Sequence, residues 1–354
     1  MRGLALSVVI DTYNHERYIE RCVQSAVEQD FPSAEYEIIV VDDGSSDRTA
    51  EVAERFAPGV RVLRKKNGGQ ASAFNAGVAE SRGEVVAFLD GDDWFASGKL
   101  TAVMEALERN PSVEAATHGY YEFRDETGEA KARVPDAEAC ISLETPDAAR
   151  EANAKSQFLL VGGMTVRRRM LDRILPIPEE LIFCADAPIA LGSLAGGVSI
   201  LKEPLFHYRH HAGNLYALSP NDKTRMRRRR EMSDRAFGIV ESLLRRLGTA
   251  PAAIRAFLYL PWIESNREGL RQFGGNQWTA FQTEMRAFQV DCEDPGLGYK
   301  MFKYGLVGLG ALMLPPRVFY GAREWYGQKN MGRVRQRIFG GQSATVAEDM
   351  RSKS

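Results

Sequence analysis

The sequence lacks the signatures of several common protein classes. Its four cysteines, Cys22, Cys140, Cys184 and Cys292, form no Cys-x-x-Cys pair, which favours buried free thiols over a zinc site or a disulfide framework. The formal net charge is −1, so no basic field argues for nucleic acid as a partner. No Gly-Lys-Ser/Thr and no Gly-x-Gly-x-x-Gly turn follows the early apolar runs, so neither a P-loop nor a nicotinamide-dinucleotide site is supported.

Long apolar stretches are also missing. The longest one, at 305–316, is too short to span a bilayer. The N-terminus leads directly into a strand-like run and does not have the pattern of a signal peptide. With 44% apolar and 26% charged residues among 354, the composition is that of an ordinary globular protein. We therefore expect a cytoplasmic protein with one large domain and an appendage.

Short apolar runs alternate with helical patterns over the first third of the chain. The runs are rich in β-branched residues, and the segments between them repeat apolar residues at helical spacing. The expected strands are 6–10, 36–41, 60–63 and 85–89, and the expected helices are 16–29, 48–56, 71–79 and 98–109. Such alternation predicts an α/β fold with a mostly parallel sheet flanked by helices.

Acidic loops follow two of these strands. Asp42 and Asp43 come after the second, and Asp90, Asp92 and Asp93 come after the fourth. The carboxyl ends of parallel strands meet at one edge of a sheet, where α/β proteins bind ligands. Three carboxylates so close together repel one another, and Mg²⁺ or Mn²⁺ would neutralise them. A solvated acidic turn is the alternative for this cluster alone.

The pattern loosens after residue 110. We expect a mixed or antiparallel strand at 113–123, a polar and mobile excursion at 125–151 and another apolar segment at 158–166. Asp186 precedes an apolar helical pattern, where a carboxylate is either a helix cap or a functional group.

The last third of the sequence has a helical pattern. Helices are expected at 223–246, 252–273 and 276–288, followed by a disordered tail at 341–354. The segment 299–326 mixes apolar, aromatic and basic residues, which suits either contact with a membrane interface or packing on the first domain.

Five motifs occur in an order that resembles glycosyltransferase family 2, whose members are inverting enzymes with the GT-A fold. The resemblance covers about residues 5–215, and the motifs are SVVIDTYN, VVDDGSSDRT, NGGQASAFNAGVAESRGEVVAFLDGDDW, CADAPIAL and YRHHAGN. It implies a GT-A domain over 1–215 and a mainly helical extension over 216–340. Three positions depart from the family pattern: Asp11 stands where proline is usual, Ala185 replaces a second acid before Asp186, and Pro188 is unusual at the start of that helix.

The resemblance also implies roles for particular residues. The predicted nucleotide-binding residues are Asp11, Thr12, Tyr13, Asp43, Gly69 and Asp90. The metal, Mg²⁺ or Mn²⁺, would be held by Asp92, Asp93 and His211, while Arg209 contacts the diphosphate or the acceptor. Asp186 is the predicted general base that takes a proton from the acceptor hydroxyl.

These roles predict a metal-dependent, inverting glycosyltransferase that uses a nucleotide-diphosphate sugar and a saccharide or lipid-linked acceptor. Such an enzyme would serve cell-surface polysaccharide or glycolipid synthesis, either in the cytoplasm or peripherally at the inner face of the cell membrane through 299–326. One alternative is a catalytically degenerate module that binds a nucleotide sugar or acts as a scaffold. A sugar nucleotidyltransferase is less well supported, because no Gly-rich loop with Arg and Lys follows the first strand.

Overall fold

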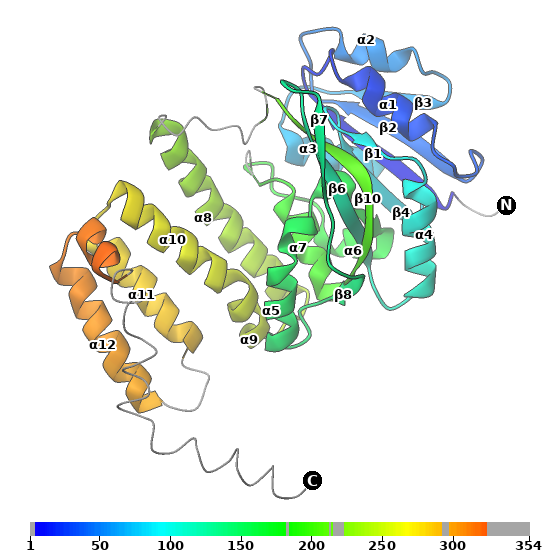
Figure 1. Ribbon diagram of the computed structural model, residues 1–354. Coiled ribbons are helices and arrows are strands. Elements are labelled where there is room, and N and C mark those ends of the chain that lie inside the picture. The colour runs from blue at the N-terminus through cyan, green and yellow to red at the C-terminus, as the bar shows by residue number, and fades with distance from the viewer. Residues whose placement is uncertain (1–3, 182–183, 212–213, 215–222, 292–296, 324–354) are drawn as a thin grey trace, which may run out of the picture. The chain divides into compact units, whose positions relative to one another are not determined.

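The computed structural model describes residues 4–181, 184–211, 214, 223–291 and 297–323, and these contain one ten-stranded sheet (Figure 1). The strand order is β3-β2-β1-β4-β9-β6-β10-β5, with β7 paired to β6 and β8 paired to β10. The strands are β1 Leu6–Thr12, β2 Tyr36–Asp42, β3 Val60–Arg64, β4 Val85–Asp90, β5 Trp94–Phe95, β6 Ala115–Arg124, β7 Glu129–Arg133, β8 Ala139–Ile141, β9 Thr165–Arg167 and β10 Val198–His210.

The pairing confirms the predicted mixed, mostly parallel α/β sheet. Strands β1 to β4 pair with one another in parallel, and β6 is parallel to β10. The short strand β9 is antiparallel to both β4 and β6 and joins the two parallel parts. The expected strand at 113–123 is β6, and its mixed pairing is as predicted.

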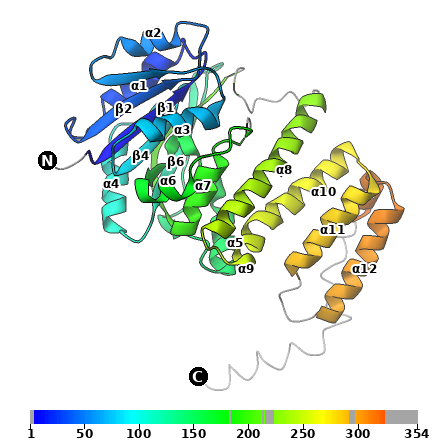
Figure 2. The same cartoon turned by 180° about the vertical axis from the view of Figure 1, so that it is seen from behind.

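Helices cover both faces of the sheet (Figures 1 and 2). Leu6, Val8 and Ile10 of β1 belong to a buried cluster with the apolar sides of α1 and α2, whereas Val9 faces α3. There Gly77 allows close approach, because a Cβ on it would lie 2.4 Å from Val9 Cγ1. The helices are α1 Ile19–Val27, α2 Thr49–Glu54, α3 Gln70–Glu80, α4 Lys99–Arg109, α5 Pro146–Ala154, α6 Arg168–Ile174 and α7 Ala187–Ser193.

The prediction of a mobile excursion at 125–151 is wrong. This stretch contains β7, β8 and most of α5. Every residue of β7 is exposed, and the only apolar residues in its sequence EAKAR are two alanines, which have low strand propensity and do not reveal a strand. Strand β7 forms because it pairs with β6, and this pairing cannot be predicted from the residues of β7 alone. The apolar segment predicted at 158–166 is largely buried, and two 3₁₀ turns, η1 Ser156–Phe158 and η2 Val161–Gly163, precede β9 there.

The chain divides into two compact units, one ending at Phe257 and the other beginning at Leu258. The first unit includes α8 Lys223–Arg246 and α9 Pro251–Ile254, so it extends beyond the domain limit predicted at 215. The second contains α10 Leu260–Phe273, α11 Gln277–Asp291, α12 Leu297–Met313 and a further helical stretch at 316–323.

The helical C-terminal region is confirmed, although a π-helical turn, η4 Arg255–Tyr259, divides the single helix predicted at 252–273. The predicted tail at 341–354 lies outside the described residues. In the described part of the chain, no helix is long and apolar enough to cross a membrane.

A lysine is buried in the core of the first unit. Lys99, at the start of α4, is fully inaccessible, and its Nζ donates a hydrogen bond to Thr165 Oγ1 at 2.9 Å. The same Nζ lies 4.2 Å from the centroid of the Phe95 ring. Burial lowers the pKa of Lys99 to about 7, because a charged ammonium group loses its hydration there.

This burial predicts a pH-dependent free energy of unfolding. Between pH 7 and 10.5 the unfolded chain holds a proton on Lys99 that the folded chain has released, so stability rises with pH in this window. Replacing Lys99 with methionine should remove this rise, which amounts to at most about 1.4 kcal/mol per pH unit. Urea denaturation across the window measures the slope. Lys131→Met, at an exposed position on β7, is the control and should keep the wild-type slope; an equal slope in both variants would contradict the prediction.

Candidate active site

The pairing of β1 with its two neighbours places acidic residues side by side at the carboxyl edge of the sheet. Asp11 is opposite Asp90 on β4, and Thr12 is opposite Asp42 on β2. Both Asp11 and Asp90 interact with Gln70 at the start of α3. Gly162 packs against the Asp90 side chain. A Cβ at position 162 would lie 2.8 Å from Asp90 Oδ2, so any residue other than glycine would force the carboxylate to shift.

Asp11 and Asp90 interact as a pair that holds a proton. Burial raises the pKa of Asp11 to about 7. Burial, followed by the charges of the neighbouring aspartates, raises the pKa of Asp90 well above its ordinary value. Two carboxylates this close cannot both be ionised at low cost, so one proton is shared between them.

Asp92 behaves differently from the other acids of the cluster. Burial raises the pKa of its carboxyl group, but the hydrogen bond with His211 and the charge of His15 outweigh burial and make the net shift downward. The distance from His211 Nε2 to Asp92 Oδ2 is 2.9 Å. Asp92 is thus the carboxylate that stays ionised, as a cation ligand must be.

Asp93 is turned toward β10. Its Oδ1 accepts a hydrogen bond from the backbone N of Arg209 at 2.7 Å, while its Oδ2 is buried without a hydrogen-bond partner. Burial and the charge of Asp92 raise the pKa of this carboxyl well above its ordinary value. Asp93 therefore connects the loop after β4 to β10.

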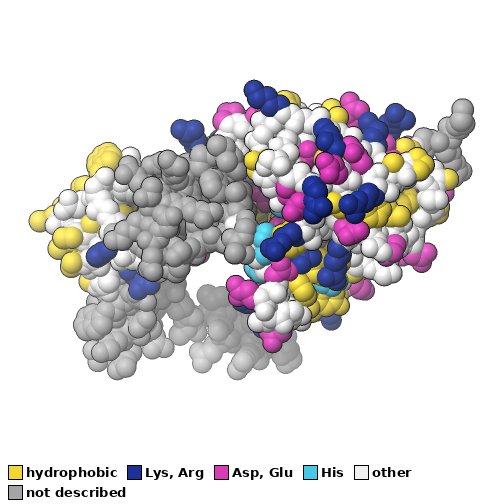
Figure 3. Space-filling view, turned by 90° about the horizontal axis from the view of Figure 1, so that it is seen from above, with side chains coloured by type: hydrophobic (Ala, Val, Ile, Leu, Met, Phe, Trp, Pro, Cys, Tyr) yellow, Lys and Arg dark blue, Asp and Glu magenta, His cyan; other side chains and the backbone are white. Residues whose placement is uncertain are grey.

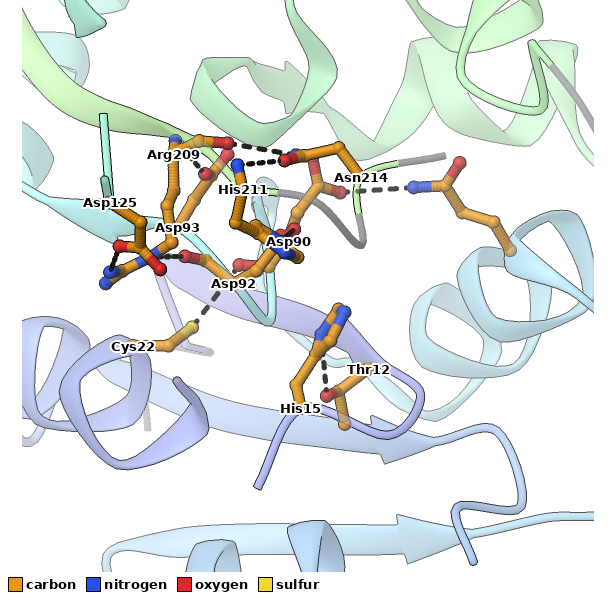
Figure 4. Close-up of polar contacts among 11 residues, drawn as sticks. Thr12, His15, Cys22, Asp90, Asp92, Asp93, Asp125, Arg209, His211 and Asn214 are labelled. Carbon is orange, nitrogen blue, oxygen red and sulfur yellow. Dashed lines mark hydrogen bonds and ion pairs between the residues drawn. The ribbon is translucent and has the colours of Figure 1, made fainter. Parts of the chain in front are cut away.

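The guanidinium of Arg209 holds the same loop a second time (Figure 4). Its Nε donates to the carbonyl oxygen of Asp92 at 2.7 Å, and its Nη1 lies 2.5 Å from Asp125 Oδ1. It also lies against the rings of Trp94 and Tyr18, 4.6 and 4.7 Å from their centroids. Arg209 is only 7% exposed, so the structure uses its donors to fix the Asp92 loop.

Asp43 organises the glycine loop before α3. Its carboxylate accepts hydrogen bonds from the backbone N of Gly68 and of Gly69, at 3.0 and 2.7 Å, and from Lys65 Nζ. Gly69 has a φ of +83°, which glycine adopts without strain. On the neighbouring loop the ring of Tyr13 is 47% exposed and is available for stacking on a flat ligand.

Asp186 lies at the N-cap of α7, but its side chain makes no capping hydrogen bond. Burial raises the pKa of its carboxyl, and the nearby backbone amides of Asp186 and Ala187 offset this only in part. Pro188 falls in the first turn of α7, where no backbone N–H is required, so it is compatible with the helix. Burial raises the pKa of Tyr208, and so do the negative charges of four carboxyl groups, those of Asp93, Asp90, Asp92 and Asp186. Asp186 therefore shares the neighbourhood of the acidic cluster.

The side chains present fit a divalent metal in part. Asp92 and His211 offer an ionised carboxylate and an imidazole at one point, ligand types that Mn²⁺ accepts. Within the described ranges, no three His, Cys, Asp or Glu side chains are arranged as a metal cluster. Phosphate oxygens of a ligand are of the kind that would complete the coordination of an ion bound there.

Comparison with known proteins places this geometry in a family. A family model described as Glycosyl transferase family 2 matches residues 7–175. An uncharacterized glycosyltransferase of Nostoc sp., alr2836, is 31% identical over 222 residues, which are 60% of this chain and 66% of the relative. EpsJ of Bacillus subtilis, also an uncharacterized glycosyltransferase, is 31% identical over 220 residues, 59% of this chain and 62% of the relative. Residues 7–175 of the chain belong to glycosyltransferase family 2.

Solved structures agree on the fold of this family 2 member. TarS 1–349 of S. aureus in complex with UDP-GlcNAc has a TM-score of 0.65 at 18% identity, and the match covers 91% of this chain and 92% of that one. This likeness supports the GT-A fold predicted from the sequence. The chain spans less than two thirds of the length of the curated relatives it matches.

The structure brings most of the predicted site residues of this family 2 chain to one edge of the sheet, and their functional roles stay predictions. Asp11, Asp90, Asp92 and His211 meet there, with Asp186 nearby. Sequence reasoning missed the residues that hold these groups in place: His15, Tyr18, Gln70, Asp125 and Gly162. Gln70 was visible inside a recognised motif, whereas nothing in the sequence connects Asp125 to Arg209.

The ion pair between Asp125 and Arg209 should contribute to stability. Arg209 is buried, so Asp125→Asn leaves its charge with a weaker partner and should lower the free energy of unfolding by about 1–2 kcal/mol. Asp147→Asn is the matched control, because Asp147 pairs with Arg150 at an exposed position and its loss should have no measurable effect. Urea denaturation distinguishes the two. Equal midpoints for Asp125→Asn and the wild type would show that Arg209 is held without this pair.

Proposed function

We propose that this chain transfers a sugar from a nucleoside-diphosphate sugar to an acceptor hydroxyl, with inversion at the anomeric carbon and with Mg²⁺ or Mn²⁺ as cofactor. The observation that carries the proposal is the meeting of Asp90 and the Asp92–His211 pair at the sheet edge, with Asp186 in the same neighbourhood. The similar fold of TarS, solved with UDP and with UDP-GlcNAc, supports uridine nucleotides as the first donors to test.

The donor would lie across the loops that follow β1, β2 and β4. Tyr13 stacks on the base, Thr12 lines the same loop, and Asp90, next to Asp11, accepts from the ribose hydroxyls. The glycine loop and Lys65 make four hydrogen-bond contacts to the two Asp43 oxygens, so a base N–H would have to share or displace one of them.

The protein groups near the diphosphate have separate tasks. Asp92 and His211 would hold the cation, and Arg209 would keep the Asp92 loop in place and contact the diphosphate only if its present partners let go. Asp93 would support the metal site by anchoring β10 rather than by free oxygen atoms on the ligand side. When bound, the ion would neutralise charge that develops on the leaving diphosphate.

Asp186 would perform the proton transfer. Its carboxylate accepts the proton from the acceptor hydroxyl as the oxygen attacks the anomeric carbon. The raised pKa of Asp186 suits this role, because a base with a pKa nearer neutrality holds the proton more firmly.

We further infer that the acceptor is a saccharide or a lipid-linked saccharide, used in making cell-surface polysaccharide or glycolipid. TarS, a similar protein over 62% of this chain, is named as a poly(ribitol-phosphate) beta-N-acetylglucosaminyltransferase. Such an acceptor would place the reaction in the cytoplasm, at the inner face of the cell membrane.

The first test concerns the metal. Mn²⁺ with UDP should raise the melting temperature of the wild type, and Asp92→Asn should weaken the apparent Mn²⁺ affinity at least about tenfold, because a carboxylate ligand is lost. Asp136→Asn, at an exposed position, is the control. The metal assignment fails if Asp92→Asn responds to Mn²⁺ as the wild type does.

The second test concerns the base. Asp186→Asn should lower kcat for transfer at least about 100-fold and leave the donor KM nearly unchanged, because only proton removal is affected. Glu180→Gln, an exposed neutralisation in the same region, should keep full activity. Near wild-type turnover in Asp186→Asn would move the base elsewhere. A wild type that binds UDP-sugars but neither transfers nor hydrolyses them, with or without metal, would favour the binding-module alternative.

A further inference from the structure

The second compact unit has an apolar surface that its own core does not use. Six large apolar side chains, all on α12 or just after it, are at least 40% exposed. We call them the α12 face: Leu306 58%, Leu309 59%, Leu312 40%, Met313 74%, Leu314 40% and Val318 55%. Figure 3 shows hydrophobic side chains gathered at the outer surface on the side where Figure 1 draws α12.

The opposite side of α12 is already packed. Ala311 is fully buried in a cluster with Ala280 of α11, and Val307 lies against the same cluster. Gly308 lets the helices approach, since a Cβ there would lie 3.3 Å from the Phe281 ring. Leu306, Leu309 and Met313 follow helical spacing on the other side, so α12 is apolar on two sides and only one is covered.

The segment that carries this face has basic residues in its sequence and no acidic ones. Residues 297–323 include Lys300, Lys303, Arg317 and Arg323 and no Asp or Glu. Arg317 is exposed next to Val318, while Arg323 pairs with the buried Glu284 of α11. An apolar helix face in a segment whose charged residues are all basic complements an anionic lipid surface. The apolar side chains would contact the acyl chains, and the basic side chains would contact the anionic headgroups.

We propose that the α12 face docks on the surface of an anionic lipid bilayer. The leucines and Met313 enter the headgroup boundary, and basic residues contact the anionic headgroups. A second copy of the chain is the competing occupant, but two such faces would bring like charges together, which opposes self-association. The inference deepens the proposed location of the reaction and does not depend on the chemistry at Asp186.

The experiment is flotation of the full chain with lipid vesicles. The wild type should float with vesicles of phosphatidylcholine containing phosphatidylglycerol, and less with phosphatidylcholine alone or at high salt. The triple variant Leu306→Ser, Leu309→Ser, Met313→Ser should bind at least about tenfold more weakly, because buried apolar area drives insertion. The matched control removes exposed apolar side chains of the first unit, Val27→Ser with Val134→Ser, and should float as the wild type does.

Two outcomes would overturn the proposal. One is flotation of the triple variant equal to that of the wild type. The other is a wild type that does not float but sediments as a dimer, with a monomeric triple variant, which would make the face a contact between copies. Thermal unfolding followed by circular dichroism verifies that the triple variant is folded.

The result is separable from that of the proposed function. Hydrolysis of a UDP-sugar in solution should be equal in the triple variant and the wild type, because the α12 face contains none of the proposed site residues. Asp186→Asn should lose transfer and still float. A failure of flotation with intact hydrolysis would therefore reject only the docking surface.

Discussion

Four carboxyl groups meet at one edge of the sheet, with Asp11 and Asp93 buried and Asp90 and Asp92 half-buried, and their mutual repulsion is what the surrounding residues must offset. The structure offsets it in different ways for different members. Asp11 and Asp90 share a proton, Asp93 accepts from a backbone amide, and Asp92 keeps its charge beside His211. Asp92 is the one of the four whose carboxyl pKa is lowered, and it is directed at a histidine rather than at another acid.

Much of the fold could be read from the sequence, because its parallel strands are buried on both faces. Runs such as 36–41 and 85–89 are nearly all apolar and end abruptly at acids, which marks both the strand and its functional end. The same reasoning fails where a strand depends on its neighbour. The exposed strand β7 contains no large apolar residue and β9 has only three residues, so their sequences are weak signals; β7 depends on pairing with β6, and β9 on pairing with β4 and β6.

The candidate site was predictable to a similar extent and for a related reason. Residues that would touch a ligand lie in loops directly after strands, where sequence position indicates location. Residues that hold these groups in place come from distant segments. Arg209 is the clearest case: its sequence context suggested contact with a diphosphate, and the structure shows that it also donates to Asp125 and to the carbonyl of Asp92. Only the folded chain shows that the guanidinium of Arg209 binds other protein groups.

The link between Arg209 and the loop after β4 also has a consequence for how the chain becomes competent during synthesis. The two ends of the Arg209 to Asp92 hydrogen bond are 117 residues apart in sequence. On the ribosome the acidic edge formed by β1, β2 and β4 is complete long before β10 emerges. A nascent chain that ends before β10 contains Asp92 but contains neither His211 nor Arg209, which holds the Asp92 loop in place. Metal binding at Asp92 would therefore depend on a late, long-range closure, which keeps an incomplete chain from acquiring a working site.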